Sequence, residues 1–156
     1  MKFLNFAKIM TCSALLGLAF VGAAHAADIG TAAEAEALVK KAVALIKSAG
    51  AEKAYDEISN GKSLKDRDLY VAVNDLTGKS LAHGANAKMI GKDMTELKDA
   101  EGHYPTKRML EIAKGAGKGW TGEYKFMNPA TQKAQTKIAY VERVGETMVI
   151  AGIYKP

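Results

Sequence analysis

Apolar and polar positions alternate in the middle of the chain. Residues 69–74 (LYVAVN) place Leu69, Val71 and Val73 on one side and the intervening side chains on the other, the period of two typical of a half-buried β-strand. Residues 75–78 (DLTG) have the composition of a tight turn, and the short segment after them can return antiparallel. The pattern therefore predicts a β-hairpin, followed by a long polar loop.

A helical period comes before this hairpin. Apolar residues recur every three or four positions over 34–48 and predict an amphipathic helix, with Thr31 and Glu34 at the spacing of a capping box. Gly50 ends it, and a second helical segment is predicted over 51–58. The apolar stripe of the first helix can be covered by the sheet alone or shared with a second copy of the chain in a homodimer.

The rest of the chain reads as one helix and three strands. A short helical turn is predicted over 93–97, and a longer amphipathic helix runs from Tyr104 to Ala113, with Pro105 in its first turn. Strands are expected over 120–127, 134–144 and 147–154, and the residues expected to share one face of the first are Trp120, Gly122, Tyr124 and Phe126. Helices and strands without a repeated strand–helix alternation indicate an α+β domain with an antiparallel sheet.

The N-terminal residues have the features of a secretory signal peptide. Two lysines precede an apolar run over 9–24, and an A-x-A cleavage site ends at Ala26. The run is shorter than the roughly 20 residues that a membrane-spanning helix needs. We therefore predict export to the periplasm, with residues 1–26 removed and residues 27–156 folded as a single domain without an anchor or an output module. The only cysteine, Cys12, would be lost with the signal peptide.

Charge and motif spacing argue against several classes of function. Without the signal peptide the net charge is +3, because that peptide holds two of the 22 basic residues and none of the 17 acidic ones. The lysines are mixed with acidic residues, so no nucleic-acid partner is expected. No serine lies in a nucleophile motif and no matched acid and base are recognisable, so we predict no enzyme. His83 and His103 lack zinc-site spacing, and residues 99–102 are too few for a calcium loop, so no metal or cofactor is expected.

The remaining polar residues suit the binding of a small anion. Tyrosine and tryptophan combine apolar surface with a polar tip, lysine and arginine can hold a carboxylate, and histidine can donate a hydrogen bond. The candidate ligand-binding residues are Tyr70, His83, Lys92, Tyr104, Arg108, Trp120, Tyr124, Lys137 and Tyr140. Tyr104 and Arg108 lie four residues apart on one helix face, which points either at the pocket or at water.

Several segments in a fixed order carry a resemblance to a known family. They read LYVAVND, TGKSLAHG, IGKD, LKDAEG, GKGWTGEYKFMNP, KIAYVERV and MVIAGIY. From Ala33 to Tyr154 the chain resembles a single Cache domain, the extracytoplasmic sensor module of bacterial chemoreceptors and kinases. The resemblance implies a PAS-like antiparallel sheet of five or six strands with a long N-terminal helix. It also implies a pocket for a small organic acid or amino-acid-like metabolite, formed by the sheet and its long loop, with Asp99 in a structural role.

These observations predict a periplasmic protein that binds or senses a small molecule, with a short carboxylate as the expected ligand. Such a domain would either deliver its ligand-bound state to a membrane receptor or kinase or buffer a metabolite. The alternative is a protein-interaction module that has lost ligand binding. In that case the helix over 34–49 or a sheet edge would be the contact surface.

Overall fold

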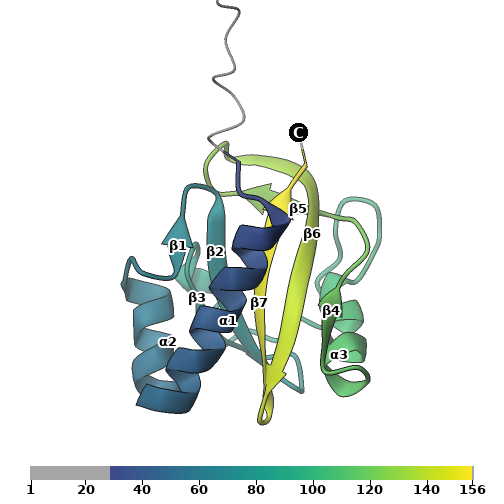
Figure 1. Ribbon diagram of the computed structural model, residues 1–156. Coiled ribbons are helices and arrows are strands. Elements are labelled where there is room, and N and C mark those ends of the chain that lie inside the picture. Colours follow the sequence, from purple (N-terminus) through teal and green to yellow (C-terminus); the bar gives the residue numbers. More distant parts are fainter. Residues whose placement is uncertain (1–28, 156) are drawn as a thin grey trace, which may run out of the picture.

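A seven-stranded antiparallel sheet, covered by helices on both faces, organises the molecule (Figure 1). The computed structural model describes residues 29–155. The helices are α1 (Ala32–Ala49), α2 (Ala51–Asn60), a short 3-10 helix η1 (Ala87–Met89) and α3 (Pro105–Lys114). The strands are β1 (Lys65–Asp66), β2 (Leu69–Asp75), β3 (Ser80–His83), β4 (Lys118–Trp120), β5 (Tyr124–Asn128), β6 (Lys133–Val144) and β7 (Thr147–Tyr154). Their order is β1-β2-β7-β6-β4, with β3 also pairing with β2 and β5 also pairing with β6.

The helix α1 packs across one face of the sheet, in front of β7 and β6 in Figure 1. It begins with the predicted capping box, in which the Glu34 N–H donates to Thr31 Oγ1 and the Thr31 N–H donates to the Glu34 carboxylate. Its buried stripe meets the apolar side chains of β2 in one core, which includes Ala35, Val39, Ala42, Val43, Leu69, Val71 and Val73. The sheet therefore covers much of the stripe that the sequence left open to a second copy.

The helix α3 closes the opposite face with a second core. Met109, Leu110 and Ala113 pack against Val141 of β6 and Met148 of β7. Since helices cover both faces, six of the seven residues of β2 are buried. Successive side chains of β2 therefore point alternately into two buried layers, and neither face of the strand is open to solvent. The prediction of an α+β antiparallel fold with a long N-terminal helix is confirmed.

The predicted strand over 120–127 is corrected to two strands that face opposite ways. Trp120 pairs with Tyr140 and Tyr124 pairs with Lys137. Four residue steps from Trp120 to Tyr124 therefore lie opposite only three steps along β6. Because successive side chains alternate in direction, this extra residue reverses the face. Trp120 therefore packs on the α1 side, whereas Tyr124 packs on the α3 side.

The loop after the hairpin also differs from the expectation. Residues 93–97 form no helix, and the short helical turn is η1 instead. Backbone bonds hold this loop to β3: the Ser80 N–H donates to Lys92 O, and the Gly91 N–H donates to Ser80 O. These two hydrogen bonds to β3, and not a helix at residues 93–97, therefore hold the middle of the loop in place.

The predictions for the N-terminal segment concern residues that the structure does not describe. The signal peptide, its cleavage site at Ala26 and Cys12 lie outside the described residues. Over residues 29–155, no helix combines the length and the apolar composition that crossing a membrane requires.

Candidate ligand-binding site

A cavity of about 60 Å³ lies between the sheet, the start of α3 and the loop that follows the hairpin. The strands contribute Tyr70, Ala72 and Asn74 from β2, Ser80 and His83 from β3, Tyr124 and Phe126 from β5, Lys137 from β6, and Ile150, Ala151 and Gly152 from β7. Met94 and Leu97 of the loop and Pro105, Thr106 and Met109 of α3 complete the lining. The cavity thus has a wall from the sheet and a cover from two other elements.

Lys137 is the only lysine or arginine among the described residues that line this cavity, and the residue is 3% exposed. Its ammonium group donates to the Tyr70 hydroxyl at 2.8 Å and to the Tyr154 hydroxyl at 3.2 Å. The same nitrogen lies 4.2 Å from the ring centre of Tyr70, 4.4 Å from that of Tyr154 and 5.3 Å from that of Phe126. Electron-rich aromatic faces and neutral oxygens therefore solvate this cation in place of water.

None of these neighbours forms an ion pair with Lys137. No salt bridge joins Lys137 to a carboxylate within residues 29–155. Burial and the adjacent Tyr70 raise the pKa of Tyr154, and burial raises the pKa of Tyr124 well above its usual value. Both phenols therefore stay protonated at neutral pH, and neither supplies a negative charge.

The hydrogen bonds around Lys137 leave the Tyr70 hydroxyl as a donor that a ligand can use. Tyr154 donates its proton to the Met127 carbonyl at 2.7 Å, so its oxygen can only accept from its other neighbours. The hydroxyls of Tyr70 and Tyr154 lie 3.3 Å apart, and Tyr70 is consequently the donor of that pair. A ligand oxygen beside Lys137 can take this Tyr70 proton instead.

His83 adds a second donor to the cavity wall. Its Nδ1 accepts from the N–H groups of Ala85 at 3.3 Å and Asn86 at 3.0 Å, which places the ring proton on Nε2. Burial, together with the charge of Lys137, lowers the pKa of His83 to about 4. The imidazole is therefore neutral near pH 7, and it stacks at a tilt with its ring centre 5.1 Å from that of Tyr70.

The nine sequence candidates divide into two groups. Tyr70, His83, Tyr124 and Lys137 meet at the cavity. The other five lie elsewhere: Lys92, Tyr104, Arg108, Trp120 and Tyr140. The rings of Trp120 and Tyr140 pack with their centres 5.4 Å apart in the core beneath α1, because the two residues pair across β4 and β6 on the face opposite the cavity.

The remaining three candidates face the surface. Arg108 pairs with Glu111 on α3, and its side chain is 60% exposed. Tyr104 lines a separate groove with Arg108, and its ring is covered by the ammonium group of Lys107, 4.2 Å from the ring centre. Lys92 is exposed on the loop. The open choice for the Tyr104–Arg108 helix face is thus resolved toward this outer groove.

Sequence reasoning missed three polar residues of the cavity, Asn74, Ser80 and Thr106. Asn74 lies on the same face of β2 as Tyr70, so the alternation of side chains along this strand could have predicted that Asn74 faces the cavity. No such pattern marked Ser80, because a bulge in β3 determines its direction. Val73 pairs with Ala82 while Asn74 pairs with Ser80, which makes Leu81 the extra residue and turns both Ser80 and His83 toward the cavity.

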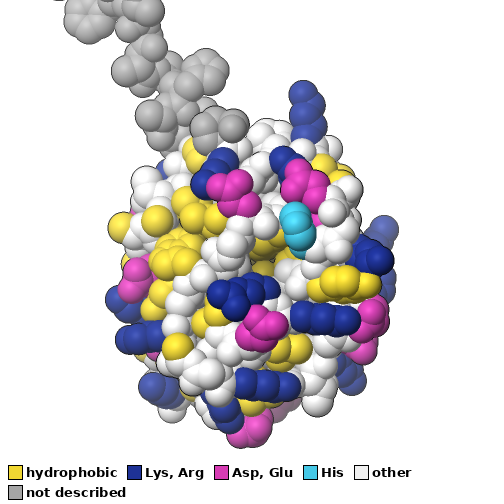
Figure 2. Space-filling model, turned by 90° about the vertical axis from the view of Figure 1, so that its right-hand side faces the viewer, with side chains coloured by type: hydrophobic (Ala, Val, Ile, Leu, Met, Phe, Trp, Pro, Cys, Tyr) yellow, Lys and Arg dark blue, Asp and Glu magenta, His cyan; other side chains and the backbone are white. Residues whose placement is uncertain are grey.

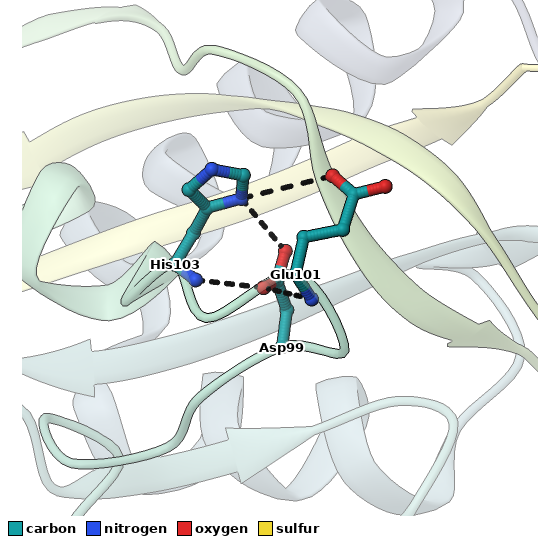
Figure 3. A group of neighbouring side chains, drawn as sticks. All are labelled: Asp99, Glu101 and His103. Atoms are coloured by element: carbon teal, nitrogen blue, oxygen red, sulfur yellow. Dashed lines mark hydrogen bonds and ion pairs between the residues drawn. The ribbon is translucent and has the colours of Figure 1, made fainter.

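Figure 3 shows a second polar cluster, in which Asp99 and Glu101 approach the ring of His103. Both oxygens of Asp99 already accept hydrogen bonds, one from the N–H groups of Glu101 and His103 and the other from the Lys125 N–H and the His103 ring. Burial alone would raise the pKa of Asp99, but the N–H donors of Lys125, His103 and Glu101 lower it to about 2. These bonds account for the cluster as a clamp between the loop and β5.

The outer surface beside α3 and β4 carries mixed charges. Figure 2 shows lysine and arginine side chains on this face separated by acidic and hydrophobic ones. The basic groups do not form there the continuous stripe that tracks a nucleic-acid backbone.

The comparison with solved structures agrees on the fold. A methyl-accepting chemotaxis protein from Vibrio parahaemolyticus RIMD 2210633 is 20% identical, with a TM-score of 0.66 over 78% of this chain and 86% of that one. The periplasmic sensor domain of a chemotaxis protein is 21% identical, with a TM-score of 0.64 over 78% and 88%. A Cache chemosensory domain solved to explain its recognition of carboxylic acids is 22% identical, with a TM-score of 0.62 over 78% and 86%.

A family model assigns the chain more directly than these distant structures do. The model described as single Cache domain 2 matches residues 23–154, nearly the whole sequence. The match agrees with the N-terminal helix and the antiparallel sheet. This chain belongs to the single Cache domain 2 family.

Proposed function

We propose that this protein is a periplasmic sensor domain that binds a short carboxylate beside Lys137. The observation that carries the proposal is that this buried ammonium group has no salt-bridge partner among residues 29–155 and is held only by neutral hydroxyls and aromatic rings. A buried charge is costly unless it is paired, and its cost here is only partly met by aromatic rings and neutral hydroxyls. A carboxylate in the cavity would supply the missing negative charge.

The polar groups around Lys137 fit the two oxygens of such a ligand. One oxygen would accept from the Lys137 ammonium group and the Tyr70 hydroxyl, and the other from His83 Nε2–H. Hydrogen bonds to charged groups contribute about 1.5–3 kcal/mol each. Since His83 is neutral, the site carries one positive charge and suits a monoanion.

The size of the cavity limits the ligand. A volume of about 60 Å³ holds roughly four to six water-sized groups, which corresponds to an acid with a short carbon chain. Met94, Met109 and Ile150 would cover its apolar part. The solved Cache domain that recognises carboxylic acids supports the same ligand class, at 22% identity.

The proposal places the mature chain, residues 27–156, in the periplasm after removal of the signal peptide. A sensor domain of this kind would pass its ligand-bound state to a membrane receptor or kinase. The chemotaxis sensor domains among its structural relatives support a sensory role of this type.

A thermal-shift screen of residues 27–156 against short carboxylates tests the proposal. At a hundred times its dissociation constant a ligand adds about 2.7 kcal/mol of stability, which gives a clear rise in Tm. We expect such a rise with one group of monocarboxylates and none with the corresponding amides. No shift with any of these acids would contradict the proposal and favour the interaction module instead.

A further inference from the structure

The cavity has a second set of polar groups, beyond those around Lys137. Tyr70, Ala72 and Asn74 face the cavity one after another along β2, so Asn74 lies four residues beyond Tyr70. Ser80 lies beside Asn74, because the two residues pair across the hairpin. The apolar Ala72 separates this pair from Tyr70 and Lys137.

Ser80 and Asn74 are buried without using their hydrogen-bonding capacity. Ser80 is 1% exposed, and its hydroxyl has no hydrogen-bond partner within the described part of the chain. Asn74 is 6% exposed, and its side-chain amide makes no hydrogen bond with residues 29–155. Buried polar side chains are nearly always paired, so two unpaired neighbours at one cavity require a reason.

The fold itself does not supply that reason. The contacts of Ser80 that hold the loop are made by its backbone, whose N–H donates to Lys92 O and whose carbonyl accepts from the Gly91 N–H. Asn74 likewise sits in regular pairing with Met148 of β7 through its backbone. Alanine at position 80 would preserve the loop contacts, so the hydroxyl has no structural task within the described residues.

We propose that Ser80 and Asn74 form a second subsite, which receives a neutral hydroxyl or carbonyl group of the ligand. The inference rests on the proposed function, because Lys137 holds the carboxylate end. Serine and asparagine can each donate and accept, so either polar group would be matched. A second carboxylate is disfavoured, because the described lining contains no cation besides Lys137.

The ligand class that follows is a short hydroxy acid or oxo acid rather than a plain fatty acid. A plain acid would leave Ser80 and Asn74 unpaired and sealed from water. Sites built around a hydrogen bond reject analogues that lack it, far more strongly than apolar pockets discriminate by size. We expect a preference of at least about tenfold for the polar acid, which corresponds to about 1.4 kcal/mol.

Calorimetric titration of matched acids tests this subsite. The probes are butyrate, its 3-hydroxy and 4-hydroxy derivatives, propionate and 3-hydroxypropionate, each titrated into wild type, Ser80→Ala and Ser48→Ala. Ser48 is the control, because its exposed hydroxyl bonds only to Leu45 O on α1, away from the cavity. In wild type and Ser48→Ala one hydroxy acid should bind at least about tenfold more tightly than its parent acid.

The Ser80→Ala protein separates a binding role from a structural one. We expect its preference to fall to within about twofold, while the Tm of the free protein stays equal or rises because an unpaired hydroxyl has been removed. Equal affinities for parent and hydroxy acids in wild type would overturn the subsite and leave the carboxylate proposal intact. A preference that survives in Ser80→Ala would overturn it as well. Binding that is absent for every acid would overturn the carboxylate proposal first.

Discussion

Gly152 on β7 leaves the space through which Lys137 reaches the cavity. A Cβ atom at position 152 would lie 2.5 Å from Lys137 Cε and 2.6 Å from the Ile138 carbonyl oxygen. Real Cβ atoms do not approach other atoms so closely, so only glycine at this position lets the lysine stem pass over the strand. The site therefore depends on a residue that has no functional group.

Replacing Gly152 by alanine should displace the Lys137 ammonium group and weaken carboxylate binding by at least about tenfold. Overpacking of this kind also destabilises a core by about 1–3 kcal/mol, so the variant should remain folded but have a lower Tm. Titration calorimetry and thermal unfolding on the same protein measure both effects.

Gly122→Ala is the matched control for this substitution. A Cβ at position 122 would meet no atom within 4 Å, so affinity and Tm should stay close to those of wild type. If Gly152→Ala binds carboxylates as wild type does, the lysine stem does not need the space over β7, and our account of the site fails.

His83 should make the protein less stable as the pH falls through the mildly acidic range. The folded state holds the pKa of His83 at about 4, mainly through burial, whereas the unfolded value is 6.5. Between these values the unfolded chain binds more protons than the folded one. The stability that the fold gains from a neutral His83 is therefore present in full above pH 6.5 and is lost as the pH falls to 4. The total is about 2–4 kcal/mol, measured by urea unfolding at a series of pH values.

His83→Asn isolates this contribution from those of other groups. The Asn oxygen can replace Nδ1 as acceptor for the N–H groups of Ala85 and Asn86, but it does not titrate. Its stability should therefore fall less steeply than that of wild type between pH 6.5 and 4. Parallel curves for the two proteins would show that His83 is not held neutral in the fold.

Asp99→Asn should loosen the clamp between the long loop and β5. One of the two oxygens becomes an NH₂ group, which cannot accept from the Lys125 N–H, and the Tm should fall by several degrees. In wild type, the lowered pKa of Asp99 implies that its stabilisation is full above pH 3.8 and is lost as the pH falls to about 2. Thermal unfolding between pH 2 and 5 measures both effects.

Asp93→Asn is the control for the clamp. Asp93 uses a single oxygen, which accepts from the N–H and hydroxyl of Thr95, so asparagine can keep both bonds. Its Tm should change little. An equal loss of stability in both variants would mean that the pairing of Asp99 with Lys125 is not what holds the loop.

Most of the fold could be predicted from the sequence, because local periodicity determines its elements. The capping box of Thr31 and Glu34 and the alternation of residues 69–74 both correspond to the observed structure. The break between β4 and β5 could not be predicted. A one-residue bulge changes which face Trp120 and Tyr124 occupy, but it leaves no periodic signal across so short a segment.

The cavity was harder to predict than the fold, since its residues come from segments far apart in the chain. Tyr70 and Lys137 are 67 residues apart, and only the sheet register brings them into contact. Tyr140 has the same chemistry as Tyr124, yet strand parity places it in the core beneath α1. Residue type identified plausible ligand contacts, whereas register and bulges decided which of them face the cavity.

The most direct test of this account is the affinity of Lys137→Met for propionate and butyrate, measured by titration calorimetry beside wild type and beside the corresponding amides. Methionine keeps the length of the stem but removes the charge and the hydrogen bonds that the ammonium group donates to the Tyr70 and Tyr154 hydroxyls. We predict that wild type prefers at least one acid to its amide by at least about tenfold, and that Lys137→Met loses this preference, with a free energy change of about 1.5–3 kcal/mol, while its own Tm stays equal or rises. Equal affinities for acid and amide in wild type, or an unchanged preference in Lys137→Met, would contradict the claim that the buried ammonium group binds a carboxylate.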